Sequence, residues 1–182
     1  FNLAGFECYD VNTNDVIANP ALLDEYHGLV ACGGFSYGDV LGAGRGWANK
    51  IKYNHDALNS LSKFFSDKNK FTLGVCNGCQ MLSNLQSIIP GSEHWPKFIK
   101  NNSNQFEARQ VLVKIPKSNS ILFKDMHKSI LPIIVSHGEG KISIKNKSSI
   151  KKAIMQYVDT TGKYTEEYPY NPNGSLNGVT GF

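Results

Sequence analysis

The sequence contains no long apolar segment, and no stretch approaches the ~18 consecutive apolar residues that a helix needs to cross a bilayer. It opens on no signal-peptide pattern. Its basic residues are scattered, and no basic run or arginine stripe underlies the net charge of +4. These features argue against a membrane protein and against a protein that binds nucleic acid.

Cysteine is also scarce, at 4 residues in 182, and the spacing of Cys8, Cys32, Cys76 and Cys79 is not that of a disulfide framework. A reducing, cytoplasmic location is therefore expected. A structural zinc site is not predicted, because Cys8 and Cys32 stand alone and no pair of histidines is separated by three to five residues. No metal is expected in this chain.

The remaining composition is that of one globular domain. With 41% hydrophobic and 19% charged residues, the 182-residue chain is large enough to bury a core of its own. We therefore expect residues 1–182 to form a single domain.

The first half of the chain alternates short β-type runs, glycine-rich turns and amphipathic segments. Apolar residues recur in steps of three, four and seven from about Trp47 to Phe65, which predicts one long helix. This order is typical of βαβ units and an open parallel sheet. The other strands expected here are Glu7 to Val11, Leu29 to Cys32 and FTLGV at 71–75, and the other helices are ALLDEYHG at 21–28 and Gln80 to Leu85.

The second half has a different pattern. The segments FEARQVLVKI, LPIIVSH and AIMQYVD are expected to be strands, with no long helices between them. The tail YPYNPNGSLNG is rich in turn-forming residues. We expect these strands to form an antiparallel excursion beside the parallel sheet.

Cys76 lies in the segment FTLGVCNGCQMLSNL, between an expected strand and an expected helix. A cysteine on a glycine-flanked strand-to-helix turn has the setting of a nucleophile elbow. The helix N-terminus favours the thiolate, and Gly74 and Gly78 leave room for the backbone at the turn. The N–H of the next residue, Asn77, could then stabilise an oxyanion. An ordinary buried cysteine is the alternative, and the two flanking glycines and Gln80 argue against it.

Cys76 and Cys79 also satisfy the Cys-x-x-Cys pattern of thioredoxin-type redox proteins. That interpretation fits the strand–turn–helix setting and stays open as an alternative. We favour a packing role for Cys79 on the first turn of the helix.

The segment ACGGFSYGDVLGAGRG, residues 31–46, holds 6 glycines between a strand and a helix. Dinucleotide binding is not indicated, because Trp47 stands where the fingerprint requires glycine, and there is no Gly-Lys-Ser/Thr phosphate loop either. The exposed amides of Gly33 and Gly34, at the end of the expected strand, are better suited to donate to an oxyanion. A flexible connector is the alternative.

The segment SHGEG pairs His137 with Glu139 after another expected strand. A base followed by an orienting acid is what a cysteine hydrolase requires, so spacing alone would make His137 the best base in the chain.

These segments together resemble the glutaminase domain of phosphoribosylformylglycinamidine synthases of the large single-chain type, which is a class I (triad) glutamine amidotransferase. The general pattern Gly-x-Cys-x-Gly-x-Gln is met by residues 74–80. More specific matches follow in the family's order over nearly the whole chain: ACGGFSYGDVLGAGRGWA, GVCNGCQMLSNL, IIPGSEHWPKFIKN, QFEAR, VSHGEG and YPYNPNGS. The small separate-subunit form shares FSYGD, but its elbow is less similar to CNGCQ.

The resemblance implies a flavodoxin-like, three-layer α/β fold and a role for each matching residue. Cys76 would attack the side-chain amide of glutamine, and backbone N–H groups at Gly33, Gly34 and Asn77 would hold the oxyanion. The residues implied to bind the amino-acid end of glutamine are Gln80, Ser136, His137 and Gly138. Glutamine hydrolysis through a thioester on Cys76 would release ammonia.

In the whole enzyme, the resemblance implies that ammonia passes to synthetase domains of the same polypeptide. Those domains would use ATP and Mg²⁺ to convert formylglycinamide ribonucleotide to formylglycinamidine ribonucleotide in the cytoplasm. No cofactor is implied for the glutaminase domain itself.

The family's base and its orienting acid form a His-Pro-Glu motif, which is expected shortly after NGVTGF and does not occur in the 182 residues. We therefore expect the chain to lack the family's first strand and its His-Pro-Glu segment, and to have little or no activity alone. In the family VSHGEG is a substrate loop, so His137 and Glu139 are expected not to be the triad. Two other functions stay open: a degenerate, non-catalytic module that docks on a partner, and a Cys-x-x-Cys redox protein.

Overall fold

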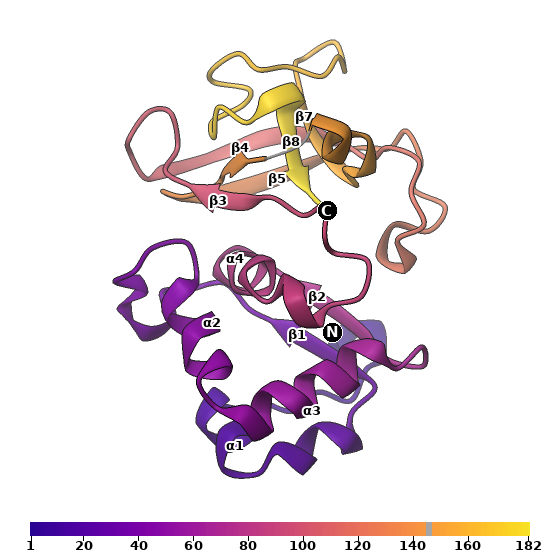
Figure 1. Ribbon diagram of the computed structural model, residues 1–182. Helices are drawn as coiled ribbons and strands as arrows, with labels where there is room; N and C mark the ends of the chain where they lie inside the picture. Colours follow the sequence, from indigo (N-terminus) through magenta and orange to yellow (C-terminus); the bar gives the residue numbers. More distant parts are fainter. Residues whose placement is uncertain (145–146) are drawn as a thin grey trace.

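The computed structural model describes residues 1–144 and 147–182. The N-terminal half, residues 1–96, places a parallel strand pair among helices, and the C-terminal half is built on antiparallel strands (Figure 1). The site described below lies where the two halves meet.

The parallel pair consists of β1 (Gly28–Ala31) and β2 (Phe71–Gly74), with Gly28 opposite Phe71 and Ala31 opposite Gly74. The connection between them runs through the glycine-rich loop and two helices, α2 (Arg45–Lys52) and α3 (His55–Ser66), and α4 (Asn77–Asn84) follows β2. The helices bury one continuous core whose members include Ile51, Leu61, Phe64, Leu82 and Leu85.

The single helix predicted from Trp47 to Phe65 is wrong, because α2 ends at Lys52 and α3 begins at His55. Asn54 caps α3: its side chain accepts a hydrogen bond from the backbone N–H of Ala57 at 2.9 Å. The two helices keep their apolar faces on the same core. The apolar residues therefore keep a helical spacing through the break between α2 and α3. In the sequence, only the capping residue Asn54 marks this break.

The strand predicted at Glu7 to Val11 is also wrong: this segment has no regular structure, and its side chains are exposed. The structure instead forms α1 (Thr13–Ala18), which has a capping box between Asn12 and Asp15. The helix predicted at 21–28 is a 3₁₀-helix, Pro20–Glu25, and it begins with a proline, as helices favour.

The C-terminal half holds an antiparallel sheet in the order β5-β4-β7-β8. Its strands are β4 (Glu107–Lys114), β5 (Ile130–His137), β7 (Met155–Val158) and β8 (Val179–Gly181). The antiparallel excursion predicted from the sequence is confirmed. Glu107 lies opposite His137 in the β4–β5 register. The sheet contributes a small hydrophobic core of its own, formed by Val111, Val113, Val135 and Tyr157.

Two further strands, β3 (Lys97–Ile99) and β6 (Lys141–Ser143), form an antiparallel pair of their own. Short 3₁₀-helices make up the other helical elements of the described residues: Asn2–Ala4, Ser36–Asp39, Gln86–Ile88, Ile121–Phe123, Lys147–Lys152 and Leu176–Gly178. None of the described helices has the length and apolar character needed to cross a membrane.

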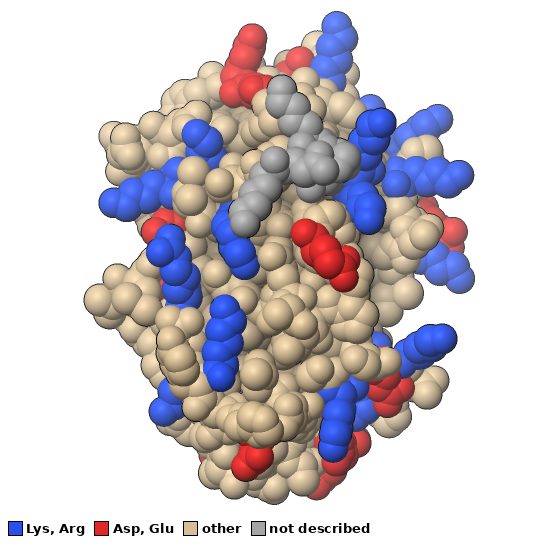
Figure 2. All heavy atoms as spheres, in the orientation of Figure 1, with Lys and Arg blue, Asp and Glu red and all other residues tan. Residues whose placement is uncertain are grey.

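The mixed α/β class predicted from the sequence is confirmed, but the parallel part is smaller than predicted. Within the described residues, parallel pairing is confined to β1 and β2, and all other strand pairs are antiparallel. A second small core joins the halves, because Ala43 of the glycine-rich loop packs with Phe98 of β3, Ile142 of β6 and Val179 of β8. On the face shown in Figure 2, the Lys and Arg side chains are spread over both halves.

Candidate active site

Cys76 lies at the junction between β2 and α4, in a backbone conformation that side-chain-bearing residues rarely adopt. Its φ and ψ are 52° and −117°, and α4 begins at the next residue, Asn77. Such a conformation costs on the order of 1–3 kcal/mol and persists only where the surrounding structure enforces it. The strand, the strained residue and the helix that follows have the arrangement of a nucleophile elbow.

Gly78 allows this turn to lie directly against β1. A Cβ at Gly78 would lie 2.0 Å from the carbonyl oxygen of Ala31, which is far inside van der Waals contact. Glycine is therefore required two residues after Cys76, because helix α4 packs with its backbone against the end of the strand. The sequence predicted that Gly78 leaves room for the backbone at the turn, and in the structure this room is filled by the contact between α4 and β1.

Two backbone N–H groups beside Cys76 are available to a ligand. Within residues 1–144 and 147–182, the N–H groups of Asn77 and Gly34 donate to no protein group, whereas the N–H of Gly78 donates to Val75 O at 2.9 Å. A Cβ at Gly33 would lie 3.1 Å from Cys76 Cβ and 3.8 Å from its sulfur, so the Gly33–Gly34 turn borders the thiol. Unpaired donors on two sides of a cysteine can stabilise an oxyanion.

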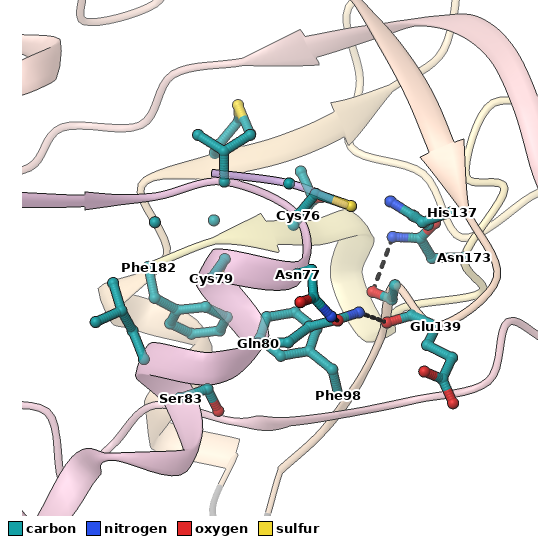
Figure 3. A pocket seen from close by; sticks show the side chains of 18 of the residues that line it. Cys76, Asn77, Cys79, Gln80, Ser83, Phe98, His137, Glu139, Asn173 and Phe182 are labelled. Atoms are coloured by element: carbon teal, nitrogen blue, oxygen red, sulfur yellow. Dashed lines mark hydrogen bonds between the residues drawn. The ribbon is translucent and has the colours of Figure 1, made fainter. Parts of the chain in front are cut away.

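A cavity of about 1220 Å³ opens at this point between the two halves of the molecule. Figure 3 shows its wall, with Cys76 from the elbow and His137 from the end of β5. The structure brings every residue predicted for the site to this one cavity: Gly33, Gly34, Cys76, Asn77, Gln80, Ser136, His137 and Gly138. The Cys76 sulfur lies 4.0 Å from the carbonyl oxygen of Ser136, to which its S–H can donate.

His137 is held by an asparagine. Its Nε2 lies 2.7 Å from Oδ1 of Asn173. Burial lowers the pKa of His137 below its usual value, while the hydrogen bond with Asn173 and the charge of Glu107 act in the opposite direction. The ring is therefore neutral around pH 7.

Glu139 does not orient His137. Its Oε2 accepts a hydrogen bond from the backbone N–H of Ala43 at 2.6 Å, so the carboxylate faces the glycine-rich loop. The His-x-Glu spacing therefore does not correspond to a base paired with its acid in this structure.

Gln80 has protein partners at both ends of its side-chain amide. Its Nε2 donates to Glu139 O at 2.7 Å, and its Oε1 accepts from Asn77 Nδ2 at 3.2 Å (Figure 3). The side chain is only 6% exposed. Gln80 thus connects α4 to the loop after β5, and a direct contact with a ligand would have to replace one of these bonds.

Cys79 lines the same cavity but is held in the core beside it. Burial, and to a lesser degree the neighbouring Cys76, raise the pKa of the Cys79 thiol to about 12. The side chain packs against the core formed by Ala43, Phe98 and Val179, and both cysteines are free thiols. The predicted packing role is confirmed, and a thiol with so high a pKa is a poor redox partner.

The sequence patterns did not point to Asn101 and Asn173, two buried asparagines that bind the loop after β5. Asn173 belongs to the segment YPYNPNGS, whose composition indicates only turns. What distinguishes Asn173 from an ordinary turn residue is its burial, and burial cannot be read from the sequence. Among the described residues, no group of three or more His, Cys, Asp or Glu side chains is arranged to hold a metal ion.

Comparisons with known proteins agree with this geometry. The sequence model of one family, described as CobB/CobQ-like glutamine amidotransferase domain, matches residues 1–182. A solved structure described as PurLQS from Thermotoga maritima is similar in fold, with a TM-score of 0.58 and 23% sequence identity. The match covers 86% of this chain and 62% of that chain, so the present chain spans less than two thirds of its length. Both findings support the α/β fold of a class I glutamine amidotransferase that the sequence predicts.

Proposed function

The chain belongs to the family of CobB/CobQ-like glutamine amidotransferase domains, and from this premise we propose that it is the glutamine-hydrolysing part of a purine-pathway amidotransferase with Cys76 as its nucleophile. The observation that carries the proposal is the conformation of Cys76, strained at φ 52° and ψ −117° between β2 and α4. A backbone strained at a cysteine that borders a cavity is explained by a requirement to present the sulfur.

The reaction follows from the groups around the sulfur. The Cys76 thiolate attacks the side-chain carbonyl carbon of glutamine, and the resulting oxyanion accepts hydrogen bonds from the N–H groups of Asn77 and Gly34. The C–N bond breaks as the nitrogen takes up a proton and leaves as ammonia, giving a glutamyl thioester on Cys76. Water then attacks the thioester, releasing glutamate and restoring the thiol.

The specific pathway rests on the ordered segments that resemble phosphoribosylformylglycinamidine synthase. Under this proposal, ammonia reaches synthetase domains of the same polypeptide, which use ATP and Mg²⁺ to convert formylglycinamide ribonucleotide to formylglycinamidine ribonucleotide. The enzyme is then a ligase driven by glutamine hydrolysis. The four free cysteines of the chain are consistent with a cytoplasmic location.

The base that activates Cys76 is proposed to come from a His-Pro-Glu segment, which the resemblance implies and which the 182 residues do not contain. The contacts of His137 with Asn173 and of Glu139 with Ala43 support this assignment, because they leave the two residues without the mutual bond of a dyad. Little hydrolysis is expected from residues 1–182 alone. Reading the natural sequence beyond Phe182 tests the point: a chain that continues without His-Pro-Glu would favour a non-catalytic docking module.

The deciding experiment uses the full natural protein and compares Cys76→Ala and Cys76→Ser with Cys8→Ala as the control. We expect both Cys76 variants to lose glutamate release by about 10³-fold or more. They should retain amidation of formylglycinamide ribonucleotide when ammonium replaces glutamine. Glutamine hydrolysis that survives in Cys76→Ala would overturn the nucleophile. A wild-type protein that hydrolyses glutamine but amidates nothing with either nitrogen source would overturn only the pathway.

A further inference from the structure

The end of β5 and the loop that follows it, together residues 136–140, are held by side-chain amides. Asn101 Nδ2 donates to His137 O at 2.8 Å, and Asn101 Oδ1 accepts from the N–H of Gly140 at 2.9 Å. The backbone N–H of Asn101 also donates to Gly138 O at 2.9 Å. One asparagine thus satisfies backbone groups of three residues, His137, Gly138 and Gly140.

Asn173 binds the same loop through both ends of its amide. Its Nδ2 donates to Gly140 O at 2.8 Å and to the Tyr157 hydroxyl at 3.0 Å, and its Oδ1 faces His137 Nε2 at 2.7 Å. The side chain is 1% exposed. A Cβ at Gly140 would lie 2.0 Å from His137 Nε2 and 2.5 Å from Asn173 Nδ2, so glycine is needed there for the contact to form.

These bonds determine the tautomer of His137. The carbonyl oxygen of Gly140 can only accept, so the atom of Asn173 that faces it must be the amide nitrogen. The atom of Asn173 that faces His137 is then the amide oxygen, which also can only accept. His137 Nε2 must therefore carry the proton, and in the neutral ring Nδ1 keeps its lone pair.

A neutral ring with a lone pair on Nδ1 can accept a hydrogen bond but cannot donate one from that atom. His137 lines the cavity that contains Cys76 (Figure 3). Of the groups at the amino-acid end of glutamine, the carboxylate only accepts and the α-ammonium only donates. A fixed acceptor suits the ammonium group and disfavours the carboxylate.

We propose that Asn173 is a positioning residue of the glutamine site: it fixes His137 as the Nε2-protonated tautomer, so that Nδ1 accepts a hydrogen bond from the α-ammonium group of glutamine. This inference rests on the proposed glutaminase function. It assigns a role to a residue outside the elbow and outside the loop itself. Asn173 acts through His137 and does not touch the substrate.

The charged and titratable groups around His137 define the expected pH dependence. Glu107 of β4 lies opposite His137 and pairs with Arg109 at 2.7 Å. Cys76 lies beside the loop, and Tyr157 of β7 reaches Asn173 with a phenol whose pKa burial raises to about 12. The other carboxylate near His137, that of Glu139 in the loop, is bound to Ala43. Replacing Asn173 by aspartate would add a negative charge directly at Nε2 and raise the pKa of His137.

The test compares Asn173→Asp with Asn171→Asp in the full natural protein. Asn171 is equally buried and lies in the same segment, but it binds Thr165, Gly174 and Ser175 and has no bond to His137. In Asn173→Asp, protonation of His137 turns Nδ1 into a donor. The KM for glutamine should then rise roughly tenfold as the pH falls from 8.5 to 6.5, with a smaller change in kcat. The KM of Asn171→Asp should follow the wild-type pH profile.

A second readout needs no turnover. Glutamine should protect Cys76 from alkylation by iodoacetamide, followed by mass spectrometry of the peptide that contains it. Wild type without protection and without hydrolysis would overturn the proposed function and this inference with it. If the glutamine concentration that gives half-maximal protection at pH 6.5 is the same in wild type and in Asn173→Asp, only the inference is overturned.

A variant of His137 covers the case in which Asn173→Asp does not fold. His137→Gln can still bond Asn173 but has no acceptor at the position of Nδ1. We expect it to need roughly tenfold more glutamine for protection, and to bind glutaramate, which lacks the amino group, as wild type does. An equal loss of protection by glutamine and by glutaramate would show that the ammonium group is not the partner.

Discussion

Glu139 Oε2 lies 2.6 Å from the backbone nitrogen of Ala43, so the carboxylate that follows His137 by two residues binds the glycine-rich loop. The contact joins segments 96 positions apart in the sequence. One of these segments carries the Gly33–Gly34 turn beside Cys76, and the other carries the loop after β5. The Glu139 carboxylate thus helps to align the two sides of the cavity, together with the small core around Ala43 and the bond from Gln80 to Glu139 O.

Replacing Glu139 by alanine should lower kcat/KM for glutamine about tenfold, because the charge-assisted hydrogen bond that holds the glycine-rich loop is lost. Glu139→Gln keeps an acceptor without the charge and should lose less. The matched control is Glu166→Ala, since Glu166 also accepts from a backbone N–H, that of Asn177 at 2.7 Å, but does not line the cavity. Steady-state glutaminase assays of the full protein measure the effect. Equal losses in the Glu139 and Glu166 variants would contradict it.

Gly78→Ala should destabilise the protein by about 2–4 kcal/mol, because the added Cβ would lie 2.0 Å from Ala31 O and force α4 away from β1. The control is Gly46→Ala inside α2, where a Cβ would meet only Tyr37 Cβ at 3.5 Å. That variant should be about 0.5–1 kcal/mol more stable, through helix propensity alone. Urea unfolding of both variants measures the difference, and a neutral Gly78→Ala would show that α4 does not pack against the strand as described.

The sequence predicted those features that local patterns encode. The elbow around Cys76 and the strands of the second half follow from turn residues and alternating apolar positions, so their predictions agree with the structure. The break between α2 and α3 did not follow from periodicity, because both helices face one core and only Asn54 marks their boundary. The partners of His137 and Glu139 could not be read from spacing either, since they are tertiary contacts with Asn173 and Ala43.

The Cys-x-x-Cys interpretation makes a separate prediction. Because burial raises the pKa of the Cys79 thiol to about 12, Cys79 is protonated at neutral pH and should not form a reversible disulfide with Cys76. Mass spectrometry after mild oxidation should find no loss of two hydrogens in the peptide that contains both residues. Cys79→Ala should leave glutamine hydrolysis unchanged and cost about 1 kcal/mol of stability through lost packing. A reversible disulfide between the two sulfurs would restore the redox interpretation.

Strain at Cys76 can be measured directly, because glycine adopts its backbone conformation without penalty. Cys76→Gly should raise the free energy of unfolding by about 1 kcal/mol relative to Cys76→Ala, which keeps a Cβ at φ 52° and ψ −117°. Both variants lack the sulfur, so the comparison isolates the backbone. Cys79→Gly against Cys79→Ala is the matched control inside α4, where glycine should be less stable by about 1 kcal/mol. A Cys76→Gly variant that is also the less stable of its pair would mean that the turn is not strained, and the argument from strain to a presented nucleophile would lose its basis.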